Sequence, residues 1–271
     1  MSNPQLITLL SDFGLEDVYV GVMKGVIAGI NPQIRVIDLT HQVPPQNVAL
    51  ASFQFQNAHH HFPEGTVHVG VVDPGVGSDR RAIALQTATA YWVGPDNGIF
   101  SGILAQCPVI SAVSLTQSRF WAGSQPSRTF HGRDIFAPVA AHLASGVPLL
   151  ALGPSIDPVT LKQLTLPSWS PTASGAEGII QAIDHFGNLI TNIPESTVQQ
   201  QHWHLKMGGV LIPGVTTYGS CAAGQLLALV GSHGWLEVAV NQGNAQDQLQ
   251  CHLGEPVVLI YSTQETSAVE S

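Results

Sequence analysis

The sequence has little charge and few basic residues. Of its 271 residues, 9 are Lys or Arg and 18 are Asp or Glu, which gives a formal net charge of −9 with neutral histidines. The basic residues form no run longer than the pair Arg80-Arg81. Nucleic acids and anionic membranes are bound through clustered positive charge, so we expect neither as the main partner of this acidic chain.

Cysteine and long apolar stretches are also scarce. The three cysteines, Cys107, Cys221 and Cys251, are odd in number and lack C-x-x-C spacing, so the sequence predicts reduced thiols rather than a disulfide framework or a zinc site. No apolar stretch approaches the roughly 18 residues that a membrane-spanning helix needs. Residues 1–5 lack the basic and apolar parts of a signal peptide. We therefore expect a cytoplasmic protein that does not enter a membrane.

Strand and helix patterns alternate in the first half of the chain. Residues 6–10 form a short apolar run typical of a buried strand, and apolar residues recur every four positions from Val18 to Ile30, which predicts a helix. The same signals predict further strands at residues 34–39, 67–72, 82–85, 91–93 and 109–115, and further helices at residues 49–60 and 134–143. This alternation favours a layered α/β domain with a largely parallel sheet.

The second half has a different character. Residues 153–175 are rich in proline, serine and threonine, which is typical of a linker. Beyond them lie short β-type runs with few helix signals, so we expect a small antiparallel barrel or sandwich. These runs span residues 178–184, 189–193, 209–212, 226–230, 236–240 and 256–261. The predicted organisation is an α/β domain over residues 1–152, the linker over 153–175, a β-barrel domain over 176–264 and a loose tail over 265–271.

One loop concentrates charged residues at the end of a predicted strand. The apolar run that ends at Val72 is followed by Asp73, a turn of sequence Pro-Gly-Val-Gly over residues 74–77, and Arg80. Glycine lets the backbone approach a ligand closely, and α/β sheets bind ligands at the carboxyl ends of their strands. The alternative is an exposed ion pair on a surface turn, which contributes little. In a chain with so few charges, the pattern favours a binding or catalytic site.

Other polar residues occupy similar positions. Asp12 follows the first predicted strand, and Asp184 follows the first strand of the second half. A single aspartate there is often a turn former, but three favour a site whose carboxylates accept hydrogen bonds from ribose hydroxyls or an ammonium group. His131 precedes a predicted helix and could transfer a proton near neutral pH. Asp134 is explained as a cap of that helix.

Two further patterns have a structural interpretation. The side chains of His59, His60 and His61 would point in different directions from a helix or strand, which predicts a solvated helix end rather than a metal site. The Gly-Ser-His-Gly segment over residues 231–234 predicts a hairpin turn, and polar loops beside it suit a purine edge. Glycine-rich phosphate-binding motifs and the G-x-S-x-G nucleophile elbow are absent from the sequence.

Six of these segments together resemble the S-adenosyl-L-methionine (SAM) hydroxide adenosyltransferase family, whose relatives include SAM-dependent fluorinating and chlorinating enzymes. No segment is decisive alone, but they occur in order over nearly the whole chain. The segments are residues 11–14 continuing to 23–25, residues 72–77 with Arg80, and residues 94–98, 130–136, 184–188 and 231–245.

The resemblance implies a Rossmann-like N-terminal α/β domain, a C-terminal β-barrel and a homotrimer that binds SAM between neighbouring subunits. It implies that Asp73, Arg80 and His131 form the catalytic set, and that SAM is the substrate with no metal or further cofactor. Asp12 corresponds to the acid that holds the ribose diol. The other implied substrate contacts are Asp17, Asp184 and Ser232 around the methionine end, and Phe186, Asn188, Asn241 and Ala245 around the adenosine.

Two departures from the halogenases bear on the reaction. His233 stands where the halogenases carry an arginine, and the short spacing from Arg81 to Tyr91 has no room for their extra loop. Both departures favour hydroxide over halide, so the resemblance implies a hydrolase that converts SAM to adenosine and methionine. A SAM-dependent halogenase and a non-catalytic SAM- or adenosine-binding module are the alternatives.

Overall fold

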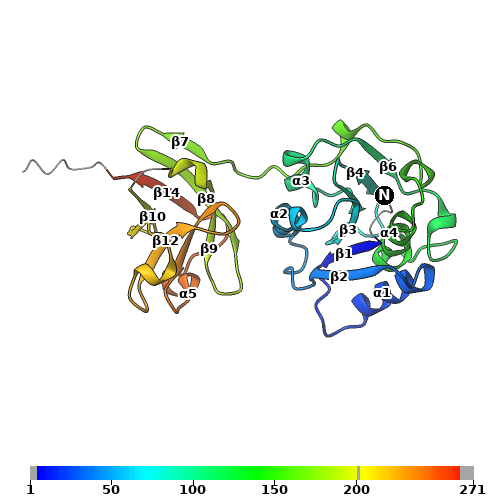
Figure 1. Cartoon of the computed structure of the whole chain (residues 1–271), viewed down its shortest axis with the longest axis horizontal. Coiled ribbons are helices and arrows are strands. Elements are labelled where there is room, and N and C mark those ends of the chain that lie inside the picture. Colours follow the sequence, from blue (N-terminus) through cyan, green and yellow to red (C-terminus); the bar gives the residue numbers. More distant parts are fainter. Residues whose placement is uncertain (1–4, 200–201, 263–271) are drawn as a thin grey trace, which may run out of the picture. The chain divides into compact units, whose positions relative to one another are not determined.

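The chain folds into two compact units. The computed structural model describes residues 5–199 and 202–262, and the boundary between the units falls between Thr165 and Leu166 (Figure 1). Within the described residues, no helix is both long enough and apolar enough to cross a membrane. The predicted tail of residues 265–271 lies outside the described residues.

The N-terminal unit is built on a six-stranded mixed sheet with the strand order β2-β1-β3-β5-β4-β6. β4 runs antiparallel to both of its neighbours, while the other five strands share one direction. The strands are β1 (Leu6–Ser11), β2 (Arg35–Thr40), β3 (Thr66–Val71), β4 (Ala82–Gln86), β5 (Ala90–Pro95) and β6 (Ser111–Ser114). The helices are α1 (Tyr19–Ile30), α2 (Val48–Ala58), α3 (Ser101–Gln106) and α4 (Ala137–Ala144).

Helices cover both faces of this sheet (Figure 1). Successive strand residues alternate between two apolar cores, as a period of two requires: Val93 belongs to one core, and its neighbour Trp92 belongs to the other. α1 and α4 contribute to the core around Val93, and α2 and α3 contribute to the core around Trp92. The predicted layered α/β domain is confirmed.

The C-terminal unit is an antiparallel sheet with the strand order β11-β10-β14-β8-β9-β13-β12, and β7 pairs with β8. The two end strands meet, because the N–H of Val215 donates to the carbonyl oxygen of Ala228 at 2.7 Å. The sheet therefore forms a nearly closed barrel, which decides between the two expected architectures. Its elements are β7 (Ser170–Thr172), β8 (Gly175–Ile183), β9 (Leu189–Pro194), β10 (Trp203–Met207), β11 (Val210–Pro213), β12 (Leu226–Val230), β13 (Trp235–Val240), α5 (Ala245–Leu249) and β14 (Pro256–Tyr261).

Short elements account for most differences from the sequence predictions. The sequence analysis missed α3, α5 and β10, each five or six residues long. The helix predicted at residues 134–143 begins earlier, with a π-helical segment at Gly132–Phe136 that continues into α4. Within the stretch predicted as a linker, the buried side chain of Leu161 joins the core of the N-terminal unit, and β7 belongs to the barrel.

Candidate active site

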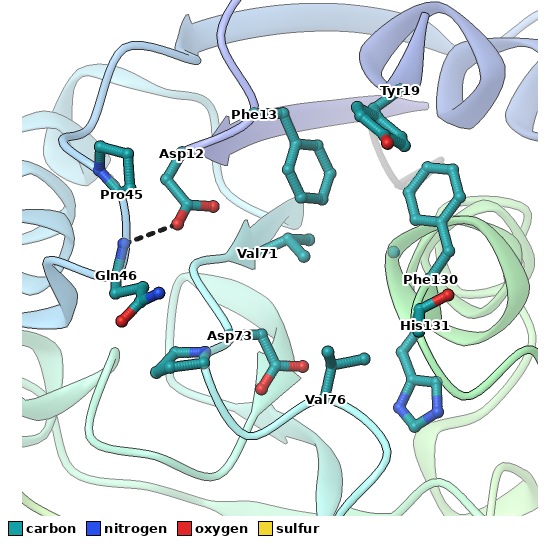
Figure 2. Close-up of a pocket in the computed structure, with 13 residues that line it drawn as sticks. Asp12, Phe13, Tyr19, Pro45, Gln46, Val71, Asp73, Val76, Phe130 and His131 are labelled. Carbon is teal, nitrogen blue, oxygen red and sulfur yellow. Dashed lines mark hydrogen bonds between the residues drawn. The ribbon is translucent and has the colours of Figure 1, made fainter. Parts of the chain in front are cut away.

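A cavity of about 450 Å³ opens in the N-terminal unit at the carboxyl ends of β1 and β3. The chain order explains its position: from β1 the chain passes through α1 to β2 on one side, and then through α2 to β3 on the other side of β1. Such a switch in strand order leaves a crevice in which α/β proteins bind ligands. The cavity brings together three predicted site residues, Asp12, Asp73 and His131 (Figure 2).

A bidentate ion pair lies at the edge of this cavity. The Nε–H of Arg80 donates to Oδ1 of Asp73 at 2.8 Å, and an Nη2–H of Arg80 donates to Oδ2. Both side chains are only 5% exposed. The alternative of an exposed surface pair is therefore wrong. Paired hydrogen bonds fix both groups, and the loss of either partner would leave an uncompensated buried charge.

Arg80 also contacts the predicted catalytic histidine. Its Nη2 lies 2.7 Å from Nδ1 of His131. Burial and the adjacent guanidinium charge both lower the pKa of His131 below its ordinary value of 6.5, so the ring is neutral at pH 7. Because arginine can only donate, Nδ1 accepts this hydrogen bond, and we assign the ring proton to Nε2.

The turn between Asp73 and Arg80 explains how the ion pair forms within one loop. The N–H of Val76 donates to the carbonyl oxygen of Asp73 at 3.2 Å, which closes the turn. Gly77 has a φ of +78°, and a Cβ at this position would overlap the carbonyl oxygen of Arg128. A side chain is therefore excluded for both conformational and steric reasons. The Nδ2–H of Asn97 donates to the carbonyl oxygen of Val72 at 2.8 Å and holds the strand end that precedes the turn.

The neighbouring arginine has a different role. Arg81 turns to Asp96, with its Nε 2.7 Å from Oδ2, and its Nη1 donates to Oγ1 of Thr160 at 3.0 Å. Asp96 also accepts the N–H of Lys162 at 2.8 Å. The segment 94–98 of the family resemblance thus connects the loop to the chain that leaves the N-terminal unit. Of the two adjacent arginines, Arg80 bonds to residues that line the cavity, whereas Arg81 stabilises the fold through Asp96 and Thr160.

Asp12 faces the cavity from the loop after β1. Its Oδ2 accepts the N–H of Gln46 at 2.8 Å, shown as the dashed line in Figure 2. Gln46 lines the cavity and has a φ of +66°, which is uncommon for a residue with a side chain. Sequence reasoning missed Gln46, and no local pattern in its segment marks it.

Three aromatic rings form one wall of the cavity (Figure 2). The ring centroids of Phe13, Tyr19 and Phe130 lie 5.2 to 5.7 Å apart, within the range of favourable aromatic pairs. Phe13 and Phe130 stand inside segments that carry the family resemblance, but sequence reasoning did not single them out. Asp17, predicted near the methionine end, is exposed in the loop before α1 and does not line this cavity.

A second cavity of about 470 Å³ lies on the C-terminal unit. Two residues predicted to contact adenosine, Phe186 and Asn188, line it together with Tyr218 and Gln242. Phe186 is 71% exposed, whereas Asn188 is buried. Tyr218 was not predicted, and 45% of its surface is exposed. The cavity therefore combines one exposed ring, one fixed amide and one phenol.

Tyr218 is held by a buried carboxylate. Its hydroxyl donates to Oε1 of Glu237 at 2.6 Å, and Oε2 of Glu237 lies 3.1 Å from Nε2 of His233. Burial and this carboxylate raise the pKa of Tyr218 above its ordinary value. Nδ1 of His233 lies 3.2 Å from the N–H of Trp235 and accepts it. Both ring nitrogens of His233 are thus used within the barrel, unlike an arginine that reaches out to a ligand carboxylate.

Asp184 forms its own turn in this structure. Its Oδ1 accepts the N–H groups of Phe186 and Asn188, each at 2.9 Å, and its Oδ2 accepts the Nδ2–H of Asn188 at 2.9 Å. These bonds fix the loop that carries two predicted adenosine contacts. The loop also approaches α5, because a Cβ at Gly187 would overlap the side chain of Asn244.

The remaining predicted contacts in the barrel occupy three different environments. Ser232 is exposed in the turn between β12 and β13, which confirms the predicted hairpin turn. Asn241 donates its Nδ2–H to the carbonyl oxygen of Cys221 at 2.7 Å. Ala245 is fully buried at the start of α5. Val240, at the end of β13, and Gln242 and Gly243, in the loop that follows it, line the cavity.

The cap predicted for Asp134 is wrong. Asp134 lies inside the π-helical segment, where its carboxylate accepts the N–H of Ser127 at 2.7 Å and pairs with Arg133. The side chains of the three adjacent histidines lie on a short 3₁₀ turn after α2. Across residues 5–199 and 202–262, no group of three or more His, Cys, Asp or Glu side chains is placed to hold a metal ion.

Comparison with known proteins covers both units. The model of the SAM hydroxide adenosyltransferase N-terminal domain matches residues 7–153, and the model of the C-terminal domain matches residues 178–258. An (R)-S-adenosyl-L-methionine hydrolase from Salinispora tropica is 42% identical over 243 residues, which cover 90% of this chain and 93% of the relative. A fluorinase from Actinoplanes sp. is 29% identical over 276 residues, covering 88% and 91%. The crystal structure of an uncharacterized conserved protein from Thermotoga maritima aligns with a TM-score of 0.89 and 36% identity, covering 94% of this chain and 99% of that chain.

Proposed function

The chain belongs to the SAM hydroxide adenosyltransferase family, and on that premise we propose that it hydrolyses SAM to adenosine and L-methionine. Its identity with an (R)-S-adenosyl-L-methionine hydrolase extends over 90% of the chain. The observation that carries the proposal is the Asp73–Arg80–His131 cluster at the edge of a cavity that also holds Asp12. A binding module would need no such fixed group of charged and titratable side chains.

The reaction follows from the chemistry of SAM. Its sulfonium sulfur leaves as the neutral thioether of methionine, so no general acid is required. The oxygen of water bonds to C5′ while the C5′–S bond breaks, and the electron pair of that bond stays on sulfur. One proton of the water must be removed. Water is a weak nucleophile, so the main task of the protein is to hold it in line with the C–S bond and to accept that proton.

Each member of the cluster has a distinct proposed role. Asp73 accepts the proton of the attacking water, and Arg80 balances the carboxylate charge and fixes its orientation. His131 orients the water. The assignment of its ring proton to Nε2 supports orientation by donation rather than proton removal by that nitrogen. Preorganised placement of reacting groups can supply about 7–11 kcal/mol of barrier reduction.

Substrate recognition is divided between the cavities in this proposal. Asp12 accepts hydrogen bonds from the ribose diol, and Phe186, Asn188 and the loop from Asn241 to Ala245 contact the adenosine. The shared cavity of Phe186 and Asn188 supports this part. Ser232, Asp184 and Asp17 are assigned to the methionine end. Asp184 acts there through the turn that it forms, because its carboxylate already accepts three hydrogen bonds.

We also propose a homotrimer in which SAM binds between neighbouring subunits, and a reducing, cytoplasmic location supported by three unpaired cysteines. Sedimentation equilibrium would measure the oligomeric state. A mixing experiment tests the shared site: Asp73→Asn chains and Phe186→Ala chains, each deficient alone, should regain part of the activity once their subunits exchange. Additive residual activities after exchange would place each site within one chain.

The hydrolase proposal is tested by incubating the purified protein with SAM in chloride-free buffer made with heavy-oxygen water. We expect adenosine that carries the label at its 5′-oxygen, together with unlabelled methionine. Intact SAM that remains bound would indicate a non-catalytic module. The similarity to a fluorinase makes a halogenase the second candidate, and formation of 5′-chloro- or 5′-fluoro-5′-deoxyadenosine only after halide is added would identify it.

A further inference from the structure

A network of buried, hydrogen-bonded side chains begins beside Asp12 and leads away from the cavity. The N–H of Phe13 donates to Oγ of Ser11 at 3.3 Å, and the same Oγ lies 2.7 Å from Nδ1 of His41. Ser11 and His41 are 1% and 3% exposed. The hydroxyl therefore connects the loop that carries Asp12 to a histidine in the interior.

The end of this network that lies farthest from Asp12 is charged. Nε2 of His41 lies 3.1 Å from Oδ1 of Asp38, off the line of a good hydrogen bond, and Nζ of Lys24 donates to Oδ2 at 2.6 Å. Burial opposes ionisation of Asp38, but the hydrogen bonds and positive charges of Lys24 and His41 together outweigh it and lower the pKa of this carboxyl. The carboxylate favours the His41 proton on Nε2, so we assign the Ser11 hydroxyl as the donor to Nδ1.

The order Ser–His–Asp invites comparison with a nucleophilic triad, but the geometry excludes that role. Ser11 is buried, accepts a backbone hydrogen bond and does not line the cavity. The network instead contacts the loop over residues 11–14. The carbonyl oxygen of His41 accepts the N–H of Gly14 at 2.8 Å, while the ring of His41 contacts Ser11. One residue therefore holds both ends of the four-residue loop, with Asp12 and Phe13 between them.

We infer that His41 is a positioning residue that acts through Ser11 to fix Asp12 for recognition of the ribose diol. The inference rests on the proposed function, in which Asp12 receives that diol. The hydrogen bond that Asp12 accepts from the N–H of Gln46 holds one oxygen of the carboxylate but not the backbone that carries it. A carboxylate on an unfixed loop would have to be ordered when substrate binds, and that cost would weaken binding. His41 and Ser11 remove this cost before the substrate arrives.

The same sheet contains a matched control. Oγ1 of Thr8 lies 2.7 Å from Nδ1 of His68, and both residues are at most 1% exposed. Thr8 stands on β1, as Ser11 does, and its hydroxyl meets a buried histidine at the same distance. Neither Thr8 nor His68 lines the cavity of the N-terminal unit. Thr8→Val and Ser11→Ala therefore each delete one buried hydroxyl bonded to a histidine. Only the hydroxyl of Ser11 is also bonded to the loop that carries Asp12.

The experiment compares the dissociation constants of adenosine and 2′,3′-dideoxyadenosine for the full chain and both variants by calorimetry. The wild-type protein should bind adenosine about tenfold or more tightly, because the diol bonds to a charged group. Ser11→Ala should reduce this ratio about fivefold while kcat at saturating SAM is retained, because binding is lost equally in the ground and transition states. Thr8→Val should keep the wild-type ratio, although both variants lose stability.

Each other outcome overturns the inference and identifies which step failed. If the wild-type protein cleaves SAM and prefers adenosine, but Ser11→Ala keeps the full ratio, the positioning role is wrong and the proposed function stands. If the wild-type protein binds both nucleosides equally, Asp12 does not read the diol. If it neither cleaves SAM nor binds adenosine, the proposed function fails as well. Should Ser11→Ala not fold, Asp38→Ala removes the half-exposed end of the network, and a smaller reduction of the same ratio is expected.

Discussion

The two cavities of the chain differ in how their polar and aromatic groups are held. In the N-terminal unit, the side chains of Asp73 and Arg80 are 5% exposed and are joined by two hydrogen bonds. In the C-terminal unit, Phe186 is 71% exposed. Fixed charges suit a reaction, because they need no reorganisation when the transition state forms. An exposed ring suits recognition, because its burial is available when a ligand arrives. In the proposed function, the N-terminal cavity therefore carries out the chemistry and the C-terminal cavity binds the adenosine.

The largest effect should come from breaking the charged cluster. Asp73→Asn keeps the shape of the side chain but removes the carboxylate that we propose as the proton acceptor. We expect kcat for SAM cleavage to fall about 10²- to 10⁴-fold, the range of a general base. Steady-state kinetics at saturating SAM measure this directly. A variant with wild-type kcat would remove Asp73 from the reaction.

The same cluster should dominate stability. Arg80→Ala leaves Asp73 as a buried unpaired charge, which we expect to lower the free energy of unfolding by about 3–5 kcal/mol. Urea denaturation measures the change. Arg133→Ala is the matched control, because the Arg133–Asp134 pair is also bidentate but its arginine is 40% exposed. The control should lose much less stability. Equal losses would mean that burial does not distinguish the two pairs.

A substitution in the cavity of the C-terminal unit should weaken SAM binding without lowering stability or kcat. Phe186→Ala removes a ring that is already exposed, so we expect an unchanged free energy of unfolding and a KM for SAM raised about tenfold, with kcat retained. Leu253→Ala, at another exposed apolar residue of the barrel outside the cavity, should change neither parameter. A lower kcat in Phe186→Ala would contradict the division between recognition and chemistry.

The smallest effect concerns pH. Because burial and Arg80 hold the pKa of His131 below 6.5, the active neutral ring persists as the pH falls through 6.5, and activity should decline only at lower pH. Profiles of kcat/KM from about pH 5 to pH 8 should therefore stay level through the ordinary histidine range. An inflection at or above 6.5 that disappears in His131→Gln would contradict the contact with Arg80.

The sequence predicted the N-terminal cluster because each member obeys a local rule. Asp12 and Asp73 end strands, Arg80 returns after a glycine turn, and parallel neighbours bring strand ends together. Gln46, in a loop, and Tyr19, at the start of α1, carry no such signal and reach the cavity only through the tertiary fold. In the barrel, Phe186 and Asn188 came from the resemblance alone.

Sequence reasoning also missed the hydrogen-bond partners of several polar side chains. Glu237 stands in an apolar strand, and only the folded hairpin shows that it engages Tyr218 and the ring of His233. Asp134 has the position of a cap, but a tertiary contact with Ser127 uses its carboxylate instead. Local patterns thus predicted most of the longer elements and the strand-end acids, whereas the side-chain networks depended on the tertiary fold.

The division between chemistry and recognition is tested most directly by measuring SAM affinity and single-turnover rate separately in Asp73→Asn and Phe186→Ala. The account predicts that Asp73→Asn binds SAM within a few-fold of the wild-type affinity and reacts slowly once it is bound. Phe186→Ala should bind weakly and react at the wild-type rate when saturated. If Asp73→Asn loses affinity in proportion to its rate, or if saturated Phe186→Ala reacts slowly, catalysis and substrate binding are not separated between the two cavities and the account is wrong.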